Sequence, residues 1–205
     1  MTRIRCTVLL LLTACYAPPN LPDFEGVPLV PAPGEGCRPE FENADVSCVI
    51  DGDTFDVGLC GDGGERFRML GIDTPETEKP GQVGQCYAEE AFAFLAGLIA
   101  GEEITVTFDQ TCVDVFGRSL GYVWAVDDLY DDLARDPDLQ PYLWTYPYDT
   151  EVPAILLNEV VLGEGYGRDY PEEIAGTLYF QKRLDEAKAT AEQFSRGLWG
   201  ACSGG

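Results

Sequence analysis

The stretch FRMLGIDTPET, residues 67–77, places an arginine in an apolar run and closes that run with two acids around a proline. The residue before a proline is biased toward extended backbone, and Pro75 has no N–H to give to a sheet, so the strand is expected to end near Asp73. Asp73 and Glu76 then lie in a loop at a strand end. Arg68 lies inside the strand, where a charge must face solvent, a partner acid or a binding site. An ordinary surface pair with an aspartate is one interpretation, and a functional site is the other.

Short β-rich runs separated by Gly/Asp turns surround this stretch. Five strands are predicted within residues 46–50, 54–60, 66–72, 103–109 and 119–126. Residues 87–101, between the third and fourth strands, have apolar side chains at helical spacing and acids in the first turn. Two further helices are predicted over residues 154–165 and 178–200. This order predicts an α+β domain built on a five-stranded OB-fold β-barrel with three helices.

The N-terminal segment has the composition of an export signal. Arg3 and Arg5 precede an apolar core too short to span a bilayer, so residues 1–14 are predicted to be a lipoprotein signal peptide. The alternative is a buried first strand or helix. The end of the segment, LTAC, resembles the bacterial lipobox, in which the signal is cleaved before a cysteine that then carries lipid. Cys15 is the expected lipidation site, and the proline-rich residues 15–37 are the expected extended tether.

A lipid on Cys15 predicts an extracytoplasmic, membrane-anchored lipoprotein, at the cell surface or on an outer membrane. No other apolar run approaches the ~18 residues of a spanning helix. The folded domain is predicted over residues 38–202, and the protein is expected to be a monomer.

Export also predicts that the cysteines form disulfides, because thiols outside the cytosol tend to pair. Cys6 and Cys15 belong to the leader, and the other six of the eight cysteines are sufficient for three disulfides. Six cysteines allow about 15 pairings, and the sequence does not choose among them. A zinc site is the alternative, but the chain has no C-x-x-C pair and no histidine. The six are Cys37, Cys48, Cys60, Cys86, Cys112 and Cys202.

The formal charge of −23 excludes a broad basic surface for nucleic acid. Without Arg3 and Arg5 the chain has 11 basic and 36 acidic residues, a formal charge of −25. Such a chain repels polyanions at long range, so any phosphate chemistry must rely on a local cluster of cations or a bound metal. Solubility, or adaptation to a salty habitat, is the simpler explanation for most of the surface carboxylates.

The absence of histidine removes zinc triads and Ser-His-Asp arrangements, so a hydrolase here must use carboxylates and arginines, with or without a metal. In VIDGDTF a tight turn holds Asp53 at the edge of the sheet, although such a turn is more often a simple hairpin. Asp53 and Asp73 offer hard oxygen donors that suit one Ca²⁺ ion. Farther along, Gly117 allows a turn and Arg118 opens a strand. Arginine's planar fork matches phosphate oxygens, so Arg68 and Arg118 beside these acids predict phosphodiester cleavage.

Five motifs in this order resemble the staphylococcal (micrococcal) nuclease, or thermonuclease, family: VIDGDTF, FRMLGIDTPET, VFGRSLGYV, LLNEVVLGEGYGR and RGLW. The resemblance covers roughly residues 46–199 and implies an OB barrel with three helices. It implies that Asp53 and Asp73 are Ca²⁺ ligands and that Thr74 adds a backbone carbonyl. The expected activity is hydrolysis of DNA or RNA by water attack on phosphorus, which leaves 3′-phosphate ends.

The same resemblance assigns roles to three catalytic residues. Glu76 matches the acid that orients or deprotonates the attacking water. Arg68 and Arg118 match the arginines that hold the scissile phosphate and stabilise its five-coordinate transition state. The expected substrate is single-stranded or fraying nucleic acid, since an OB face with aromatic side chains favours exposed bases.

The chain also departs from the family pattern. Val115 and Phe116 stand where the family usually has a lysine and a tyrosine, which leaves terminal phosphate contacts open. Phe116 and Tyr170 are weak candidates for substrate binding. Residues 127–153 form an acidic, aromatic insertion in place of a tight turn, with eight acids and Arg135 as the one basic residue. It is expected to be a solvated loop packed by its own aromatics, while an acidic lid or a platform for bases is the alternative.

Two other functions remain open at this point. Related barrels serve as non-catalytic modules that bind nucleic acid or protein, although such modules typically lose the catalytic acids and arginines, which this chain retains. The third possibility is a calcium-binding surface lipoprotein in which the acidic insertion does the binding.

Overall fold

The computed structural model describes residues 33–170 and 178–202. The predicted signal peptide, Cys15 and most of the predicted tether lie outside the described residues. The last part of that tether, residues 33–37, lies against the domain, because the Gly34 N–H donates to the Asp109 carbonyl at 3.2 Å. Among the described residues, no helix is long and apolar enough to cross a membrane.

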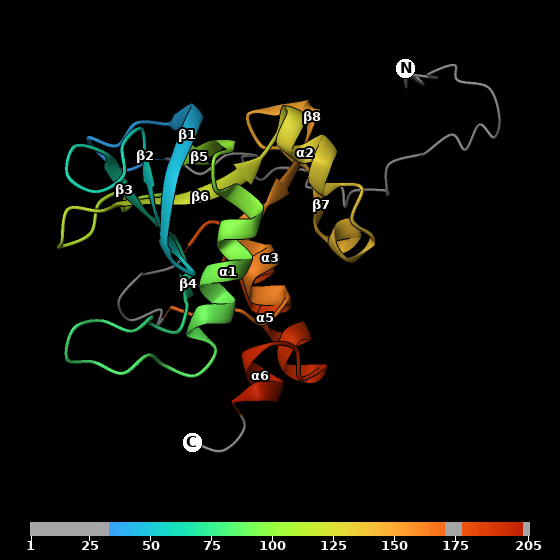
Figure 1. Ribbon diagram of the computed structural model, residues 1–205. Helices are drawn as coiled ribbons and strands as arrows, with labels where there is room; N and C mark the ends of the chain where they lie inside the picture. The colour runs from blue at the N-terminus through green and yellow to red at the C-terminus, as the bar shows by residue number, and fades with distance from the viewer. Residues whose placement is uncertain (1–32, 171–177, 203–205) are drawn as a thin grey trace.

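A five-stranded closed barrel forms the centre of the molecule, as predicted (Figure 1). The strands lie in the order β3-β2-β1-β5-β6, and β3 pairs in parallel with β6 to close the barrel. The strand bounds are β1 Glu40–Asp51, β2 Thr54–Val57, β3 Glu65–Met69, β5 Glu103–Thr107 and β6 Ser119–Ala125. β1 is longer than predicted because its first half pairs with β5 and its second half with β2.

Large apolar side chains fill the barrel and the space under the helices. Phe55, Phe67 and Trp124 are at most 1% exposed. Phe55 and Phe67 stack with their ring centroids 5.5 Å apart. Full burial of one such side chain contributes about 1.5–3 kcal/mol, so these rings account for much of the domain's stability.

The helices cover one end and one side of the barrel. The three predicted helices correspond to α1 (Ala88–Ile99), α3 (Leu157–Gly163) and α5 (Gln181–Gln193), and the short α6 (Leu198–Ala201) follows α5. Buried Asn158 joins α3 to the barrel: its Oδ1 accepts from the Val123 N–H, and its Nδ2 donates to the Leu70 carbonyl, each at 2.8 Å. This side chain satisfies backbone groups that would otherwise be buried without partners.

The prediction of one continuous helix over residues 154–165 is wrong in its first part. Residues up to Leu156 belong to β8 (Asp149–Leu156), which pairs antiparallel with β6 and with β7 (Leu143–Tyr146). The apolar run Ala154–Leu157 is fully buried in the core, and periodicity alone does not separate a buried strand from a buried helix.

The insertion is not a solvated loop. It contains α2 (Asp127–Leu133), a 3₁₀ helix at Pro137–Tyr142, and β7, which extends the barrel sheet beyond β8. Its aromatic side chains reach the domain rather than packing only on one another. The Tyr142 hydroxyl donates to Glu164 at 2.7 Å, and the Trp144 Nε1–H donates to Glu159 at 3.0 Å.

Three disulfides pair the six cysteines of the domain: Cys37–Cys112, Cys48–Cys60 and Cys86–Cys202. The third joins Cys86, two residues before α1, to Cys202, which directly follows α6. Cys48 and Cys60 lie close to Asp56, and these three form the one cluster of three or more metal-type ligands in the described part of the chain. Since both cysteines are in a disulfide, the cluster is not a zinc site.

Candidate active site

The site begins at the turn between β1 and β2. A Cβ on Gly52 would lie 2.7 Å from the Ala91 Cβ and 2.9 Å from the Thr74 Cβ, so only glycine lets α1 and the Thr74 side chain approach this turn. The turn directs Asp53 inward, where it is 1% exposed. Its Oδ2 accepts from the Thr74 N–H at 2.9 Å, and its Oδ1 accepts from the Thr54 hydroxyl at 2.8 Å.

Arg68 on β3 joins two acids from different segments. Its Nη1 donates to Asp53 Oδ1 at 2.8 Å, and its Nη2 donates to Asp73 Oδ1 at 2.6 Å. Asp73 ends β4 (Ile72–Asp73), and its side chain is half exposed. The surface pair considered for Arg68 is therefore a buried bridge between two carboxylates.

The pKa of Asp53 is raised to about 7. Burial is the main cause, Arg68 opposes it, and the charge on Asp51 adds to it. Burial lowers the pKa of Arg68, but the charges of Asp53 and Asp73 raise it by more, so the net shift of this pKa is upward. An additional cation beside Asp53 would favour its ionised form.

The donor set fits a hard cation. Asp53 and Asp73 each bond one nitrogen of the same guanidinium, so their carboxylates are neighbours. The Thr74 main chain is adjacent, as its N–H bonds Asp53, and the Thr74 hydroxyl is buried without a hydrogen-bond partner among the described residues. Carboxylate and carbonyl oxygens are the ligands that Ca²⁺ prefers.

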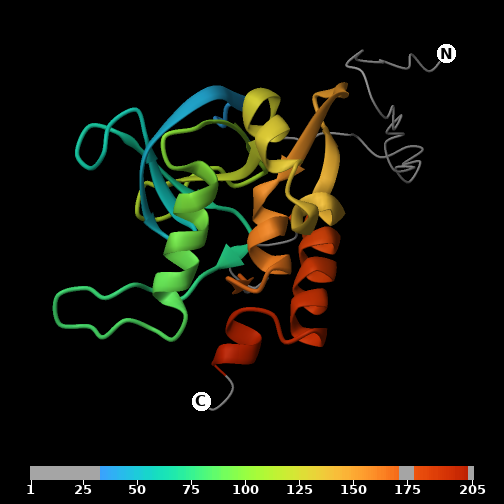
Figure 2. The ribbon, with the colours of Figure 1, turned by 45° about the vertical axis from the view of Figure 1, so that its right-hand side comes forward.

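Glu76 lies on the long loop between β4 and α1, which Figures 1 and 2 show in green at the lower left. Gln85 holds this loop closed: its Oε1 accepts from the Glu76 N–H, and its own N–H donates to the Glu76 carbonyl, each at 2.9 Å. The Glu76 carboxylate is ion-paired with Lys79, and this hydrogen bond raises the pKa of Lys79.

Arg118 precedes β6 and is oriented by Asp114. The Arg118 Nε donates to Asp114 Oδ2 at 2.6 Å, while Asp114 Oδ1 accepts from the N–H groups of Phe116 and Arg118 at 2.8 and 2.9 Å. Asp114 thus shapes the loop and holds one edge of the guanidinium. Among the described residues, no hydrogen bond to either Nη group of Arg118 is present, so both face an incoming anion.

These groups meet at an open cavity of about 420 Å³. It is lined by Arg68, Asp73, Glu76, Phe116, Arg118 and Tyr170, all of which the sequence predicts as site residues. Asp53 and Thr74 lie buried beside it. Phe116 is 81% exposed, and the guanidinium of Arg68 lies 5.4 Å from the ring centroid of Tyr170.

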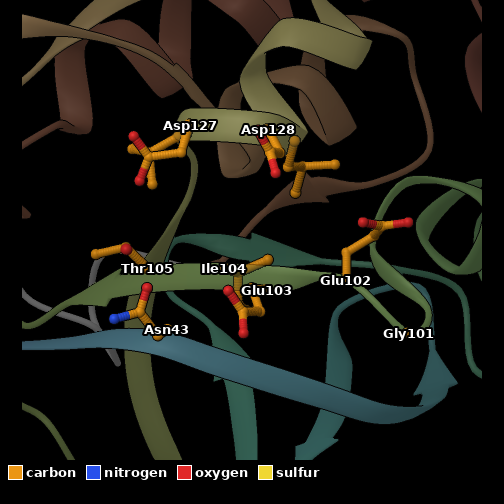
Figure 3. Close-up of a pocket in the computed structure, with 10 residues that line it drawn as sticks. Asn43, Gly101, Glu102, Glu103, Ile104, Thr105, Asp127 and Asp128 are labelled. Carbon is orange, nitrogen blue, oxygen red and sulfur yellow. The ribbon is translucent and has the colours of Figure 1, made fainter.

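The insertion does not line this cavity. Figures 1 and 2 both place it, in yellow and orange, on the side of the barrel away from the Glu76 loop. No residue of 127–153 is among the lining residues, so neither a lid nor a base platform gains support. A separate cavity of about 260 Å³ lies between β5 and α2, where Glu103 and Asp127 make an acidic lining (Figure 3).

Three residues that shape the site are absent from the prediction: Lys79, Gln85 and Asp114. Lys79 and Asp114 lie three and four residues from Glu76 and Arg118, a spacing that could have indicated pairing. No comparable local signal identifies Gln85, which meets Glu76 only because the loop closes.

This chain is similar in sequence to known nucleases and to a nuclease family model. The model of the staphylococcal nuclease homologue family matches residues 66–201. The thermonuclease of Staphylococcus intermedius is 37% identical over 86 residues, which cover 42% of this chain and 51% of that protein. The thermonuclease of Staphylococcus hyicus is 27% identical over 151 residues, 74% of this chain and 72% of that protein.

The SPbeta prophage-derived endonuclease YokF of Bacillus subtilis is 35% identical over 86 residues, 42% of this chain and 29% of that protein. The chain therefore spans about half the length of the first of these relatives and less than a third of the last. The family match extends from β3 to α6 and includes Arg68, Asp73, Glu76 and Arg118. The chain belongs to the staphylococcal nuclease homologue family.

Proposed function

We propose that this protein is a calcium-dependent nuclease that hydrolyses phosphodiester bonds of DNA, RNA or both and leaves 3′-phosphate ends. The observation that carries the proposal is the convergence of Arg68, Glu76 and Arg118 on one open cavity, with the Asp53 and Asp73 carboxylates beside it. Two thermonucleases and an endonuclease among its relatives support the same reaction class.

Asp53, Asp73 and the Thr74 main chain would hold one Ca²⁺ ion, which when bound supplies positive charge to a phosphate oxygen. Arg68 already bonds both carboxylates, so it couples metal ligation to phosphate binding. Asp73 would share its carboxylate between such a cation and Arg68, and Arg68 would direct its guanidinium to a phosphate oxygen.

Glu76 would act as the general base. Its carboxylate accepts a proton from water while the water oxygen bonds to phosphorus, and the bond from phosphorus to the 5′-oxygen breaks. Lys79, ion-paired with Glu76, restricts the position of the carboxylate. Arg118 presents its two Nη groups to the oxygens on which negative charge develops.

Exposed aromatic side chains favour a single-stranded or fraying substrate. Phe116 and Tyr170 line the cavity, and every base offers a face for stacking. Phe116 keeps a ring where the family usually has a tyrosine, and Val115 omits the positive charge of the lysine, so this loop supplies stacking without an added cation. The enzyme is expected to act as a monomer.

The leader sequence and the three disulfides support an extracytoplasmic enzyme anchored through lipid on Cys15. Expression of the full chain and of Cys15→Ser in a bacterial host tests this location. The unchanged chain should sediment with membranes and the variant should not, whereas equal sedimentation would contradict lipid anchoring.

The decisive test is cleavage of single-stranded DNA by the disulfide-bonded protein, with Ca²⁺ and with a chelator. Glu76→Gln and Arg118→Ala should each reduce kcat by about 10²-fold or more. Arg135→Gln, in the insertion, serves as the control and should retain activity. Folded protein that binds DNA but cleaves none under any condition would instead identify a non-catalytic binding module.

A further inference from the structure

Arg168 stands apart in the charge arrangement of the molecule. Within residues 33–170 and 178–202, every other lysine and arginine is ion-paired with a carboxylate. Its neighbouring acids are already engaged, because Asp73 pairs with Arg68 and Asp169 pairs with Lys188. In a chain with so large an acidic excess, an exposed arginine without a carboxylate partner in the described structure is available to an external anion.

Strand register places Arg168 next to the candidate active site. β9 (Arg168–Asp169) pairs antiparallel with β4, and Arg168 is directly opposite Asp73. The pairing continues through the Tyr170 N–H, which donates to the Gly71 carbonyl at 3.1 Å. Directly opposed residues, and residues two apart on one strand, share a face. Arg168 therefore lies on the same face as Asp73 and Tyr170, both of which line the cavity.

Trp199 on α6 holds the guanidinium in place. The Arg168 Cζ lies 5.2 Å from the centroid of the Trp199 ring. A guanidinium over an aromatic face keeps the N–H groups on its edge free, and these match two phosphate oxygens. Because the side chain is already ordered, less conformational entropy is lost when an anion binds.

We propose that Arg168, positioned on Trp199, binds a backbone phosphate of the nucleic-acid substrate close to the one that is cleaved. This subsite rests on the proposed nuclease function. Residues two apart on a strand are about 7 Å apart, so Arg168 and Tyr170 meet an extended single strand at two separate points, and the phosphate at Arg168 is distinct from the one that is cleaved. A substrate with a single phosphodiester cannot use both positions.

Binding of a labelled single-stranded oligonucleotide, measured by fluorescence anisotropy over a series of salt concentrations, tests the proposal. All proteins carry Glu76→Gln to prevent cleavage, and they differ in having Arg168→Gln, Arg135→Gln or neither. The two arginine variants lose the same charge, and Arg135 is exposed and lies in the insertion.

Loss of Arg168 should weaken binding. It should also make the negative slope of log association constant against log salt shallower by about 0.7, the value for one phosphate contact on a single strand. The Kd of the Arg168→Gln protein divided by the Kd of the Arg135→Gln protein should consequently fall about fivefold for a tenfold increase in salt. Arg135→Gln should leave the slope unchanged. Equal slopes and affinities for the two variants, or no oligonucleotide binding by any of the proteins, would overturn the proposal.

Cleavage measurements separate this subsite from the proposed function. With Glu76 intact, Arg168→Gln should raise KM for an oligonucleotide, leave kcat unchanged, and leave cleavage of a dinucleotide unchanged. Protein that binds the oligonucleotide through Arg168 but cleaves nothing would retain the subsite and refute the nuclease. Cleavage with no effect of Arg168→Gln on KM would support the nuclease function and refute the subsite.

Discussion

At the scale of single residues, Asp114 orients Arg118 in the candidate active site. Burial raises the pKa of Asp114, but hydrogen bonds from the Arg118 N–H and side chain lower it by more. The net shift is downward, so the carboxylate is ionised beside Arg118. Asp114→Asn keeps an acceptor for the loop N–H groups but weakens the hold on the guanidinium. We expect kcat to fall about 10- to 100-fold with little change in the free energy of unfolding.

Steady-state kinetics and denaturant unfolding check this expectation. Asp132→Asn is the matched control, because Asp132 is paired with an exposed arginine, Arg135, and should leave both quantities unchanged. Equal kcat values for the two variants would show that Asp114 does not orient Arg118.

Asp56 provides a prediction about stability and pH. Its buried carboxylate accepts from Arg66 Nε at 2.7 Å and from the Gly61 N–H at 2.8 Å, and the Arg66 bond lowers its pKa. A group with a lowered pKa stabilises the fold above the ordinary aspartate pKa, about 3.9, and loses this contribution as pH falls through the folded value. Asp56→Asn should therefore lower the free energy of unfolding by about 2 kcal/mol at pH 7.

The difference between Asp56→Asn and the unchanged protein should shrink below about pH 4. Urea unfolding of both proteins at pH 7 and pH 3 measures it. A difference that stays constant across this range would show that the Arg66 ion pair is not its cause.

The candidate site residues were predictable from sequence because they lie in short motifs. Asp53 follows a recognisable strand, Arg68 occupies one and Arg118 precedes one, and the structure brings them together. Gln85 was not predictable, because its contact with Glu76 depends on the closed shape of the intervening loop. The pairing of Arg68 with two acids also depends on the tertiary structure, since Asp53 and Asp73 come from separate turns.

At the scale of elements, the Cys86–Cys202 disulfide supports the Glu76 loop. Cys86 directly follows Gln85, whose side chain and backbone hold Glu76. The Cys86→Ala/Cys202→Ala double variant should reduce kcat several-fold, because the loop end is no longer fixed to α6. The disulfide has a sequence separation of 116, so its loss should lower the free energy of unfolding by about 5 kcal/mol.

Cys48→Ala/Cys60→Ala is the control, measured in the same kinetic and unfolding assays. That disulfide has a sequence separation of 12, so its loss should lower the free energy of unfolding by about 3 kcal/mol and leave kcat unchanged. If the two double variants had the same kcat, the disulfide would have no role in positioning Glu76.

The barrel strands were predictable as elements, but the insertion was not. Alternating apolar residues and glycine turns mark β2, β3, β5 and β6. The insertion has the composition of a loop, with many acids and prolines, and its strands form because β8 pairs with β6 and β7 pairs with β8. Strand propensity is decided largely by such neighbours, which a local pattern does not reveal.

At the scale of the whole molecule, net charge should govern how cleavage depends on salt. The chain, at a formal −23, repels DNA at long range, and this repulsion is strongest at low ionic strength. At constant Ca²⁺, kcat/KM should first rise with NaCl as the repulsion is screened. It should then fall as salt competes for the phosphate contacts. Initial rates over a salt series measure the profile, and a steady fall from the lowest salt upward would contradict it.

The disulfides also determine how the molecule responds to proteases. The spans of Cys37–Cys112 and Cys86–Cys202 overlap in sequence, so together they enclose residues 37–202 without a gap. A single cut at any peptide bond between these ends leaves both products covalently joined. A protease that nicks one exposed loop therefore releases no fragment, and the two halves of the barrel stay together at a fixed, high local concentration.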